Sequence, residues 1–181
     1  MLRFEGAAHL RARLVAAVLS GRAVKIQRIR ESAAQPGLRS HEASLLRLLE
    51  KVLVGAEVSI NETGTELTFR PGLVAGGSVT HKCSGRAVGY FLEPLVSLAL
   101  FGKRELVATL TGVTNDDRDV SVDACRMALL PLLRRLGVEG RVELEVRKRG
   151  CSPGGGGEVL LRVPPCRKLR AVEVVEEGLV R

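Results

Sequence analysis

The predicted order of strands and helices occurs twice along this chain, and that repetition constrains the fold more than any other feature of the sequence. Hydrophobic periodicities predict strand, helix, strand, helix, strand and strand over residues 1–80, and the same order again over residues 81–181. A further strand is expected at 167–175. Each unit would bury the apolar faces of its helices against one face of its sheet. We therefore predict an α+β fold, an α/β sandwich of tandem β-α-β-α-β-β repeats.

The expected elements begin and end where each periodicity does. In the first unit they are strand 2–4, helix 8–20, strand 24–30, helix 38–54 and strands 57–61 and 66–70. In the second unit they are strand 78–82, helix 86–100, strand 105–111, helix 121–136 and strands 142–149 and 158–163. Ser121 is the expected N-cap of its helix, and Pro131 should kink that helix or begin its last turns.

Glycines mark corresponding points in the two units. Gly21 and Gly102 follow the first predicted helix of each unit, and Gly55 and Gly137 follow the second. A glycine at this point can adopt the left-handed conformation that ends many helices. The spacing therefore predicts that all four residues are helix C-caps.

The charge balance favours a polyanionic partner, RNA first among them. The chain has 28 Lys and Arg residues against 20 Asp and Glu, a net charge of +8. Only 3% of residues are aromatic, which argues against a platform that stacks on unpaired bases. The longest stretch without a charged residue falls short of the roughly 20 apolar residues of a membrane helix. The composition therefore predicts contact with an RNA backbone or folded shape, and no membrane.

Neither a metal site nor a cofactor site is expected. The cysteines lack C-x-x-C spacing, and the histidines lie far from them in sequence; the residues are Cys83, Cys125, Cys151, Cys166, His9, His41 and His81. Each histidine is expected on a surface or a helix face. Asp116, Asp117 and Asp119 lack the glycine and distal glutamate of a calcium loop, and we expect them in a solvated loop.

A glycine-rich segment joins the last two strands of the second unit. It reads Arg149-Gly150-Cys151-Ser152-Pro153, followed by Gly154, Gly155, Gly156 and Gly157. No Gly-Lys-Ser/Thr follows and a strand comes next, so it is no P-loop. It is either a mobile hairpin connection or a backbone that approaches a ligand or another chain closely. In the second case Arg147, Lys148 and Arg149 would supply the positive charge beside it.

This segment resembles the signature of RNA 3′-terminal phosphate cyclases, Arg/His-Gly-x-x-Pro-x-Gly-Gly-Gly-x-aliphatic. Other segments resemble the family in the same order; they are Leu19-Ser20-Gly21, Pro36-Gly37-Leu38-Arg39, Phe69-Arg70-Pro71-Gly72-Leu73 and Thr111-Gly112-Val113-Thr114-Asn115-Asp116. The resemblance implies repeated β-α-β-α-β-β units. It also implies a third repeat and an inserted domain in a full-length member, so we expect this chain to be the N-terminal half.

The N-terminal loop separates two branches of that family. In that loop true cyclases carry the motif Glu-Gly-Gly-Gly-Gln-x-x-Arg, whose glutamate and glycines serve nucleotide and metal binding. They use ATP, and their catalytic histidine lies in the distal half of the protein. This chain has Glu5-Gly6-Ala7-Ala8-His9-Leu10-Arg11. It therefore resembles the cyclase-like branch, which implies a non-catalytic role in pre-rRNA processing and small-subunit (18S rRNA) biogenesis. No catalytic residue is expected here.

The same resemblance implies a nucleolar location in the nucleus, a small-subunit pre-ribosome and a nucleolar GTPase as partners. Arg11 and Arg30 match arginines around the phosphate-handling pocket of the cyclases, and Arg39 is a third candidate for binding RNA or another anion. Alternatively, Arg30 merely ends a strand and Arg11 is an exposed helix residue. Two other functions stay open: a divergent ATP-dependent cyclase, and a bare RNA-binding module.

Overall fold

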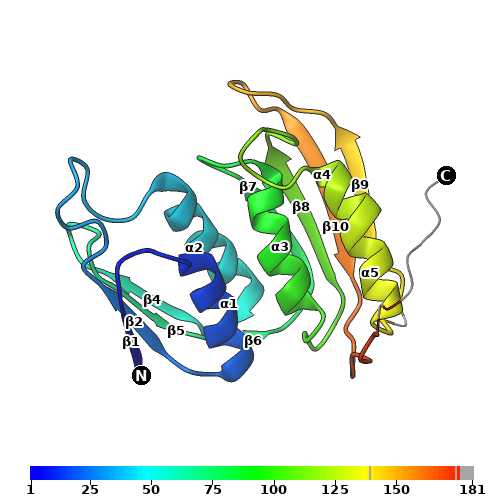
Figure 1. The fold of residues 1–181 in the computed structure, drawn as a ribbon, viewed down its shortest axis with the longest axis horizontal. Coiled ribbons are helices and arrows are strands. Elements are labelled where there is room, and N and C mark those ends of the chain that lie inside the picture. Colours follow the sequence, from blue (N-terminus) through cyan, green and yellow to red (C-terminus); the bar gives the residue numbers. More distant parts are fainter. Residues whose placement is uncertain (139, 174, 176–181) are drawn as a thin grey trace.

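Two four-stranded sheets form the framework of the molecule. A computed structural model describes residues 1–138, 140–173 and 175. The first sheet has the order β1-β2-β5-β4, formed by Leu2–Glu5, Val24–Gln27, Leu67–Arg70 and Glu57–Ile60. The second has the order β7-β8-β10-β9, formed by Gly77–Lys82, Leu106–Gly112, Gly157–Val163 and Glu143–Lys148. In each sheet the first two strands pair in parallel and the others antiparallel (Figure 1). The predicted tandem repeat is confirmed.

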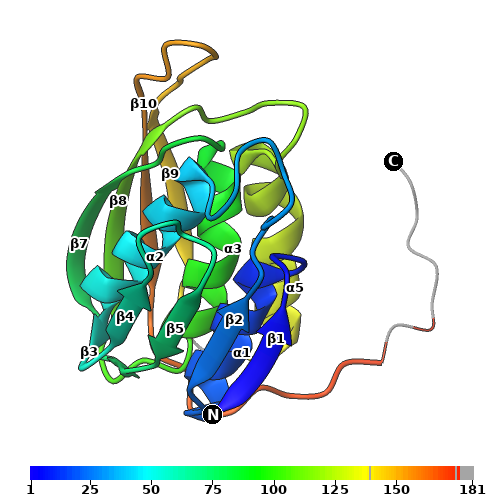
Figure 2. The same ribbon diagram turned by 90° about the vertical axis from the view of Figure 1, so that its left-hand side faces the viewer.

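The helices cover one face of each sheet, as expected (Figure 2). The first repeat has α1 (Leu10–Ser20) and α2 (Ser40–Val52), and the second has α3 (Val88–Ala99) followed by a segmented helix. Its segments are α4 (Val122–Ala124), the π-helix η1 (Cys125–Leu129) and α5 (Leu130–Arg135). Helix α2 forms where the sequence predicts it because its leucines recur on one side, and they are buried against the sheet. Among the described residues no helix is long and apolar enough to cross a membrane.

The two repeats share one hydrophobic core. Buried residues of the helices and sheets of both repeats belong to a single cluster, from Leu14 and Phe69 in the first repeat to Phe91 and Leu161 in the second. His81 on β7 is 5% exposed, and its Nε2 shares a hydrogen bond of 2.9 Å with Ser44 of α2. The expectation that His81 lies on a surface or helix face is therefore wrong. It lies on the face of β7 that packs against the other repeat, and burial lowers its pKa to about 4.

Several predicted boundaries in the first repeat change. The strand predicted at 24–30 ends at Gln27, because Arg28 and Arg30 adopt the left-handed conformation with φ of 55° and 50°. Helix 38–54 ends at Val52, and its last two residues form the short strand β3 (Leu53–Val54), paired with β6 (Leu73–Val74). Strand β7 begins at Gly77, one residue before the start predicted for it at 78. The division into 1–80 and 81–181 stays a prediction.

Most predicted helix ends are confirmed, but one helix of the second repeat is interrupted and one predicted C-cap is wrong. Ser121 is the N-cap, since its Oγ accepts from the Ala124 amide at 3.0 Å. Beyond it, the predicted continuous helix 121–136 contains the π turn, and Pro131 lies in the first turn of α5. Gly21 and Gly137 end helices with φ of 65° and 81°, as predicted. Gly102 has no left-handed φ, so that part of the prediction is wrong.

Two further departures concern Gly55 and the end of the described chain. Gly55 is left-handed, with φ of 78°, but it follows β3 rather than a helix. Nor do 167–173 and 175 form the strand expected at 167–175; residue 174 lies outside the described residues. Two prolines precede this segment and supply no backbone donor. It is held instead by the amides of Cys166 and Arg170, which donate to Leu100 and Leu136 carbonyls at 2.6 and 2.7 Å.

Candidate functional site

A cleft of about 320 Å³ lies where the two repeats meet. We name it the inter-repeat cleft. Its lining comes from the loops before α1, α3 and α4 and from α1, α2 and α3 themselves. It includes Ala7, His9 and Tyr90, the cations Arg11, Arg86 and Arg118, and the carboxylates Glu42, Glu93 and Asp119. Helices α1 and α3 pack against each other beside it. The cleft therefore depends on the docking of one repeat on the other.

Arg11, one of the predicted anion-binding residues, lies in this cleft and joins the repeats. Its guanidinium carbon lies 4.7 Å from the centre of the Tyr90 ring, and its Nη1 donates to the Tyr90 carbonyl at 3.0 Å. Its Nη2 also pairs with Glu93. On the other repeat, Arg86 lies 5.1 Å from the same ring centre. Tyr90 is therefore flanked by two guanidinium groups.

Pro94 explains why the Tyr90 carbonyl can accept from Arg11. In an uninterrupted helix, the amide four residues later occupies each carbonyl. That amide would belong to Pro94, which lies inside α3 and has no N–H. The unused acceptor is then satisfied by a side chain of the neighbouring repeat. A proline in one repeat thus creates the binding point for an arginine of the other.

Arg30 lies outside the inter-repeat cleft and is committed to a carboxylate. Its two terminal nitrogens donate to the two oxygens of Glu42 at 2.8 and 2.6 Å, and one of them also reaches the Gly37 carbonyl. The Glu42 side chain is 4% exposed and accepts from the Arg39 amide at 2.7 Å. The bonded carboxylate raises the pKa of Arg30. The Arg39 side chain, also a candidate, donates to Gln35 at 2.9 Å.

A matching pair in the second repeat was not foreseen. Arg86 donates to both oxygens of Asp119 at 2.9 and 2.5 Å, and the Asp119 side chain is 3% exposed. Asp119 also accepts from the Ala87 amide, and its carboxylate raises the pKa of Arg86. Asp119 is therefore buried, and the prediction that it lies in a solvated loop is wrong. The sequence does not indicate this contact, because Arg86 and Asp119 are 33 positions apart and no motif links them.

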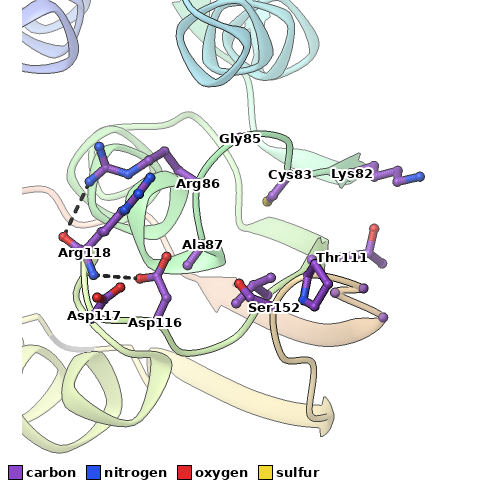
Figure 3. Close-up of a pocket in the computed structure, with 16 residues that line it drawn as sticks. Lys82, Cys83, Gly85, Arg86, Ala87, Thr111, Asp116, Asp117, Arg118 and Ser152 are labelled. Atoms are coloured by element: carbon purple, nitrogen blue, oxygen red, sulfur yellow. Dashed lines mark hydrogen bonds between the residues drawn. The ribbon is translucent and has the colours of Figure 1, made fainter.

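A larger cleft of about 710 Å³ adjoins the first, and we name it the glycine-loop cleft (Figure 3). It lies between the glycine-rich segment, the end of β7 and the loop that follows β8. Its lining includes Lys82, Arg86, Arg118, Ser152 and Gly154–Gly156, together with the carboxylates Asp116 and Asp117. Arg86 and Arg118 line both clefts. Among the described residues, no carboxylate lies within 4.0 Å of the cations of Lys82 or Arg118.

The geometry of the loop explains most of its glycines. Gly155 and Gly156 are left-handed, with φ of 67° and 76°, and the Gly155 amide donates to the Cys151 carbonyl at 2.8 Å. A Cβ on Gly157 would lie 2.7 Å from the Gly112 carbonyl oxygen, and one on Gly150 only 2.2 Å from the Gly157 nitrogen. Gly154 alone has neither constraint. The loop is therefore a hydrogen-bonded turn whose base needs glycine for close packing.

Arg147, Lys148 and Arg149, the cations predicted to lie beside this loop, do not line the glycine-loop cleft. Arg149 donates to both oxygens of Asp123 at 2.5 and 2.8 Å, and this pair holds the pKa of Asp123 well below its usual range. Arg147 pairs with Glu158 at 3.3 Å, while Lys148 is exposed on β9. None of them lines the glycine-loop cleft. The structure thus brings neither this trio nor Arg30 and Arg39 to the clefts.

Comparison with known proteins decides the family. The family model described as RNA 3′-terminal phosphate cyclase matches residues 2–178. The chain belongs to this family. A probable cyclase-like protein of Dictyostelium discoideum is 42% identical over 183 residues, covering 100% of this chain and 49% of its own length. The mouse RNA 3′-terminal phosphate cyclase-like protein is 48% identical over 182 residues, covering 99% and 49%.

A third relative has a name that states a process. The rRNA processing protein rcl1 of Schizosaccharomyces pombe is 42% identical over 181 residues, covering 98% of this chain and 50% of its own length. The chain thus spans about half the length of the curated relatives it matches. Relatives named cyclase-like share its whole length, as the N-terminal loop led us to expect.

The N-terminal loop of this cyclase-family member contributes two side chains, those of Ala7 and His9, to the lining of the inter-repeat cleft. Ala7 packs against the core and His9, which also lines the cleft, has a left-handed φ of 53°. Glu5 points elsewhere, since its carboxylate lies 3.6 Å from Arg28 in a separate hollow of about 610 Å³. Among the described residues no three His, Cys, Asp or Glu side chains are grouped to hold a metal ion.

Proposed function

We propose that this protein acts without cyclase chemistry in pre-rRNA processing, as a factor in small ribosomal subunit (18S rRNA) biogenesis. The names of its relatives, rRNA processing protein and cyclase-like protein, support this role. Its net charge of +8 supports RNA as a partner. In this proposal the protein works in the nucleolus, within the small-subunit pre-ribosome and beside a GTPase partner, away from membranes and without a cofactor.

The observation that carries the proposal is the loop before α1. Nucleotide phosphates are usually held by glycine backbones that can approach them closely. Here Ala7 and His9 place side chains at the inter-repeat cleft, and Glu5 turns away toward Arg28. This geometry opposes a triphosphate at the loop and leaves the cleft to smaller or extended anionic groups.

The two arginines matched to the cyclase pocket differ in what they can do. The Arg11–Glu93 pair is about one-third exposed on both sides, with side-chain exposures of 33% and 39%. Pairs of this kind contribute about 0–1 kcal/mol, so an incoming phosphate can replace Glu93. Glu42 is buried, and separating it from Arg30 would cost about 3–5 kcal/mol. We therefore assign anion contact in the clefts to Arg11, Lys82 and Arg118.

By the same reasoning Arg30 and Arg86 are structural. Each holds a buried carboxylate and a loop next to a cleft. Arg39 contributes its backbone amide to the first of these anchors. Its side chain, bonded to Gln35, is half-buried and points along the loop rather than into either cleft.

Depletion of the protein in cells of its source tests the proposed role. We expect pre-rRNA to accumulate and mature 18S rRNA to fall, while the large-subunit rRNA stays at its normal level. Rescue with the wild-type gene should restore 18S rRNA, and rescue with Arg11→Glu should be weaker. Unchanged 18S rRNA after depletion would reject the role.

The alternative is a divergent ATP-dependent cyclase. Family membership alone favours it. Incubation of the protein with radiolabelled ATP and Mg²⁺, beside a known cyclase as control, separates the two. A covalent protein–AMP band, or conversion of an RNA 3′-phosphate to a 2′,3′-cyclic phosphate, would overturn the non-catalytic proposal. We expect neither product.

A further inference from the structure

Exposed cations gather where α5 ends, in a region that lies outside the two clefts described above. Two of them, Arg134 and Arg135, occupy the last turn of that helix. The segment after β10 carries three more and returns to the same place, where the Arg170 amide donates to the Leu136 carbonyl at 2.7 Å. Figure 1 shows this segment beside the end of α5. We name the group the α5 basic surface; it comprises Arg134, Arg135, Arg141, Arg167, Lys168 and Arg170.

The packing of Arg170 shows that the two segments touch. A Cβ placed on Gly137 would lie 2.9 Å from the Cγ atom of Arg170, so the arginine stem lies directly over the turn that ends α5. Leu169 packs against the core on the inner side, while Arg167 and Lys168 are exposed. The chain thus anchors its apolar residue and presents its cations outward.

The charges of this surface are largely uncompensated. All six side chains are exposed, and among the described residues only Arg141 forms an ion pair, with Glu143 at 3.3 Å. The cations at the opposite end of β9 behave differently, since Arg147 and Arg149 both pair with carboxylates. Positive charge that has no intramolecular partner is available to phosphates.

The surface is also hollowed. Arg167, Lys168 and Arg170 line a hollow of about 480 Å³ with Pro165 and Cys166. Arg126, Arg134 and Arg141 line a groove of about 500 Å³ between α5 and β9, together with Glu143 and Glu145. No aromatic residue lines either hollow, which leaves bases nothing to stack on. A chain of phosphates would fit a path of this kind better than a single flat ligand.

We propose that the α5 basic surface binds the phosphate backbone of RNA without reading its sequence. The inference rests on the proposed function for the identity of the polyanion. Helix electrostatics explains part of the cluster, since cations near a helix C-terminus stabilise it. That effect accounts for Arg134 and Arg135, but not for the cations contributed by the other segment.

The experiment compares two triple variants that remove the same charge. The first is Arg134→Gln, Arg167→Gln and Lys168→Gln on the proposed surface. The matched control is Arg147→Gln, Lys148→Gln and Arg149→Gln, at the other end of β9. Arg170 is left unchanged because it packs on Gly137. The dissociation constant for a labelled single-stranded 20-nucleotide RNA of mixed sequence is measured between 50 and 200 mM KCl.

For the surface variant we expect at least a 10-fold loss of affinity at 50 mM KCl. Each lost phosphate contact removes about 0.7 from the slope of log affinity against log salt, so three contacts remove about 2. The control should lose less than threefold. Chemical unfolding of each variant establishes that it is folded, and single Arg167→Gln and Lys168→Gln variants replace the triple if it is not.

Equal losses in the two variants would overturn the proposal, because net charge alone would then explain binding. Unchanged RNA affinity in the surface variant would also overturn it, as would binding to phosphatidylserine vesicles in place of RNA. These results leave the proposed role in processing untouched, since depletion tests that role separately. Conversely, RNA binding through this surface can hold even if depletion leaves 18S rRNA unchanged.

Discussion

The two repeats share a strand order but differ in the helix that precedes their last two strands. The N-caps Arg39 and Ser121 are 82 residues apart, so the two helices begin at corresponding positions. Helix α2 then runs without interruption, whereas its counterpart contains the π turn η1. Beyond the caps, Leu45 is 0% exposed and its counterpart Met127 is 75% exposed. The same topology thus tolerates a changed side-chain register, because a π turn rotates the helix faces.

The repeats differ as well in their final hairpins. The first is closed by a compact turn in which the Asn61 side chain accepts from the Glu66 amide at 2.9 Å. The second extends into the glycine loop and lines a cleft. In both repeats a buried carboxylate anchors the loop before the second helix, Glu42 in one and Asp119 in the other. The difference shows that the framework is repeated while the clefts are built from loops of unequal length.

The largest expected effect comes from breaking these anchors. Arg30→Leu would leave Glu42 buried without its cation, and Arg86→Leu would do the same to Asp119. Each should lower the free energy of unfolding by about 3–5 kcal/mol. Because the repeats share one core, urea unfolding followed by circular dichroism should shift as one transition in both variants. Two separate transitions, with only one displaced, would contradict the shared core.

The second test contrasts the counterparts in the two helices. Leu45→Ala creates a cavity in the core and should cost about 3 kcal/mol. Met127→Ala removes a side chain that is mostly in solvent and should change stability by less than about 0.5 kcal/mol. Urea midpoints of the two variants measure both values. Equal costs would mean that the helix faces correspond after all.

A third prediction concerns the contact between repeats and its dependence on pH. Burial lowers the pKa of His81 to about 4, and the charges of Lys51 and Arg47 add to this. Below pH 6.5 the histidine is protonated in the unfolded state but stays neutral in the folded state. The free energy of unfolding therefore falls as the pH drops from 6.5 to 4. The loss should reach about 2 kcal/mol. The free energy of unfolding of His81→Gln should depend less on pH across this range. An equal dependence in the variant and the wild type would show that another group causes the effect.

The smallest expected effect tests the proline in α3. Pro94→Ala restores an amide that competes with Arg11 for the Tyr90 carbonyl. Arg11→Gln should then cost less in the Pro94→Ala background than in the wild type, by about 0.5–1 kcal/mol. A double-mutant cycle of unfolding free energies measures this coupling. Additive costs would show that the carbonyl contact contributes nothing.

Much of the framework could be predicted from the sequence, because periodicity depends on local residue order. The stripe of leucines in α2 and the alternation of β9 each mark one buried face, and both elements lie where expected. The π turn could not be predicted in this way, since it keeps the helical pattern while changing the register. The left-handed Arg28 and Arg30 carry no such signal either, because neither is glycine.

The site was predicted less completely than the fold. Resemblance singled out Arg11, which the structure places in the inter-repeat cleft; its role in anion binding stays a prediction. Arg86, Asp119 and Tyr90 meet there only after the chain has folded. The basic trio at 147–149 was expected beside the glycine loop because it is adjacent in sequence. In the structure, nearby carboxylates on β10 and α4 take up two of its charges. Adjacency in sequence therefore does not bring these charges into the glycine-loop cleft, and a role for the trio in anion binding stays a prediction.

The glycine loop has a consequence for the use of sequence signatures. Its base at Gly150 and Gly157 leaves no room for a Cβ atom, and its tip needs left-handed residues. A substitution here would disturb the hairpin before it could affect any reaction. The pattern therefore identifies a shape rather than a reaction. Assigning chemistry to such a chain requires segments outside the signature, above all the loop that precedes the first helix.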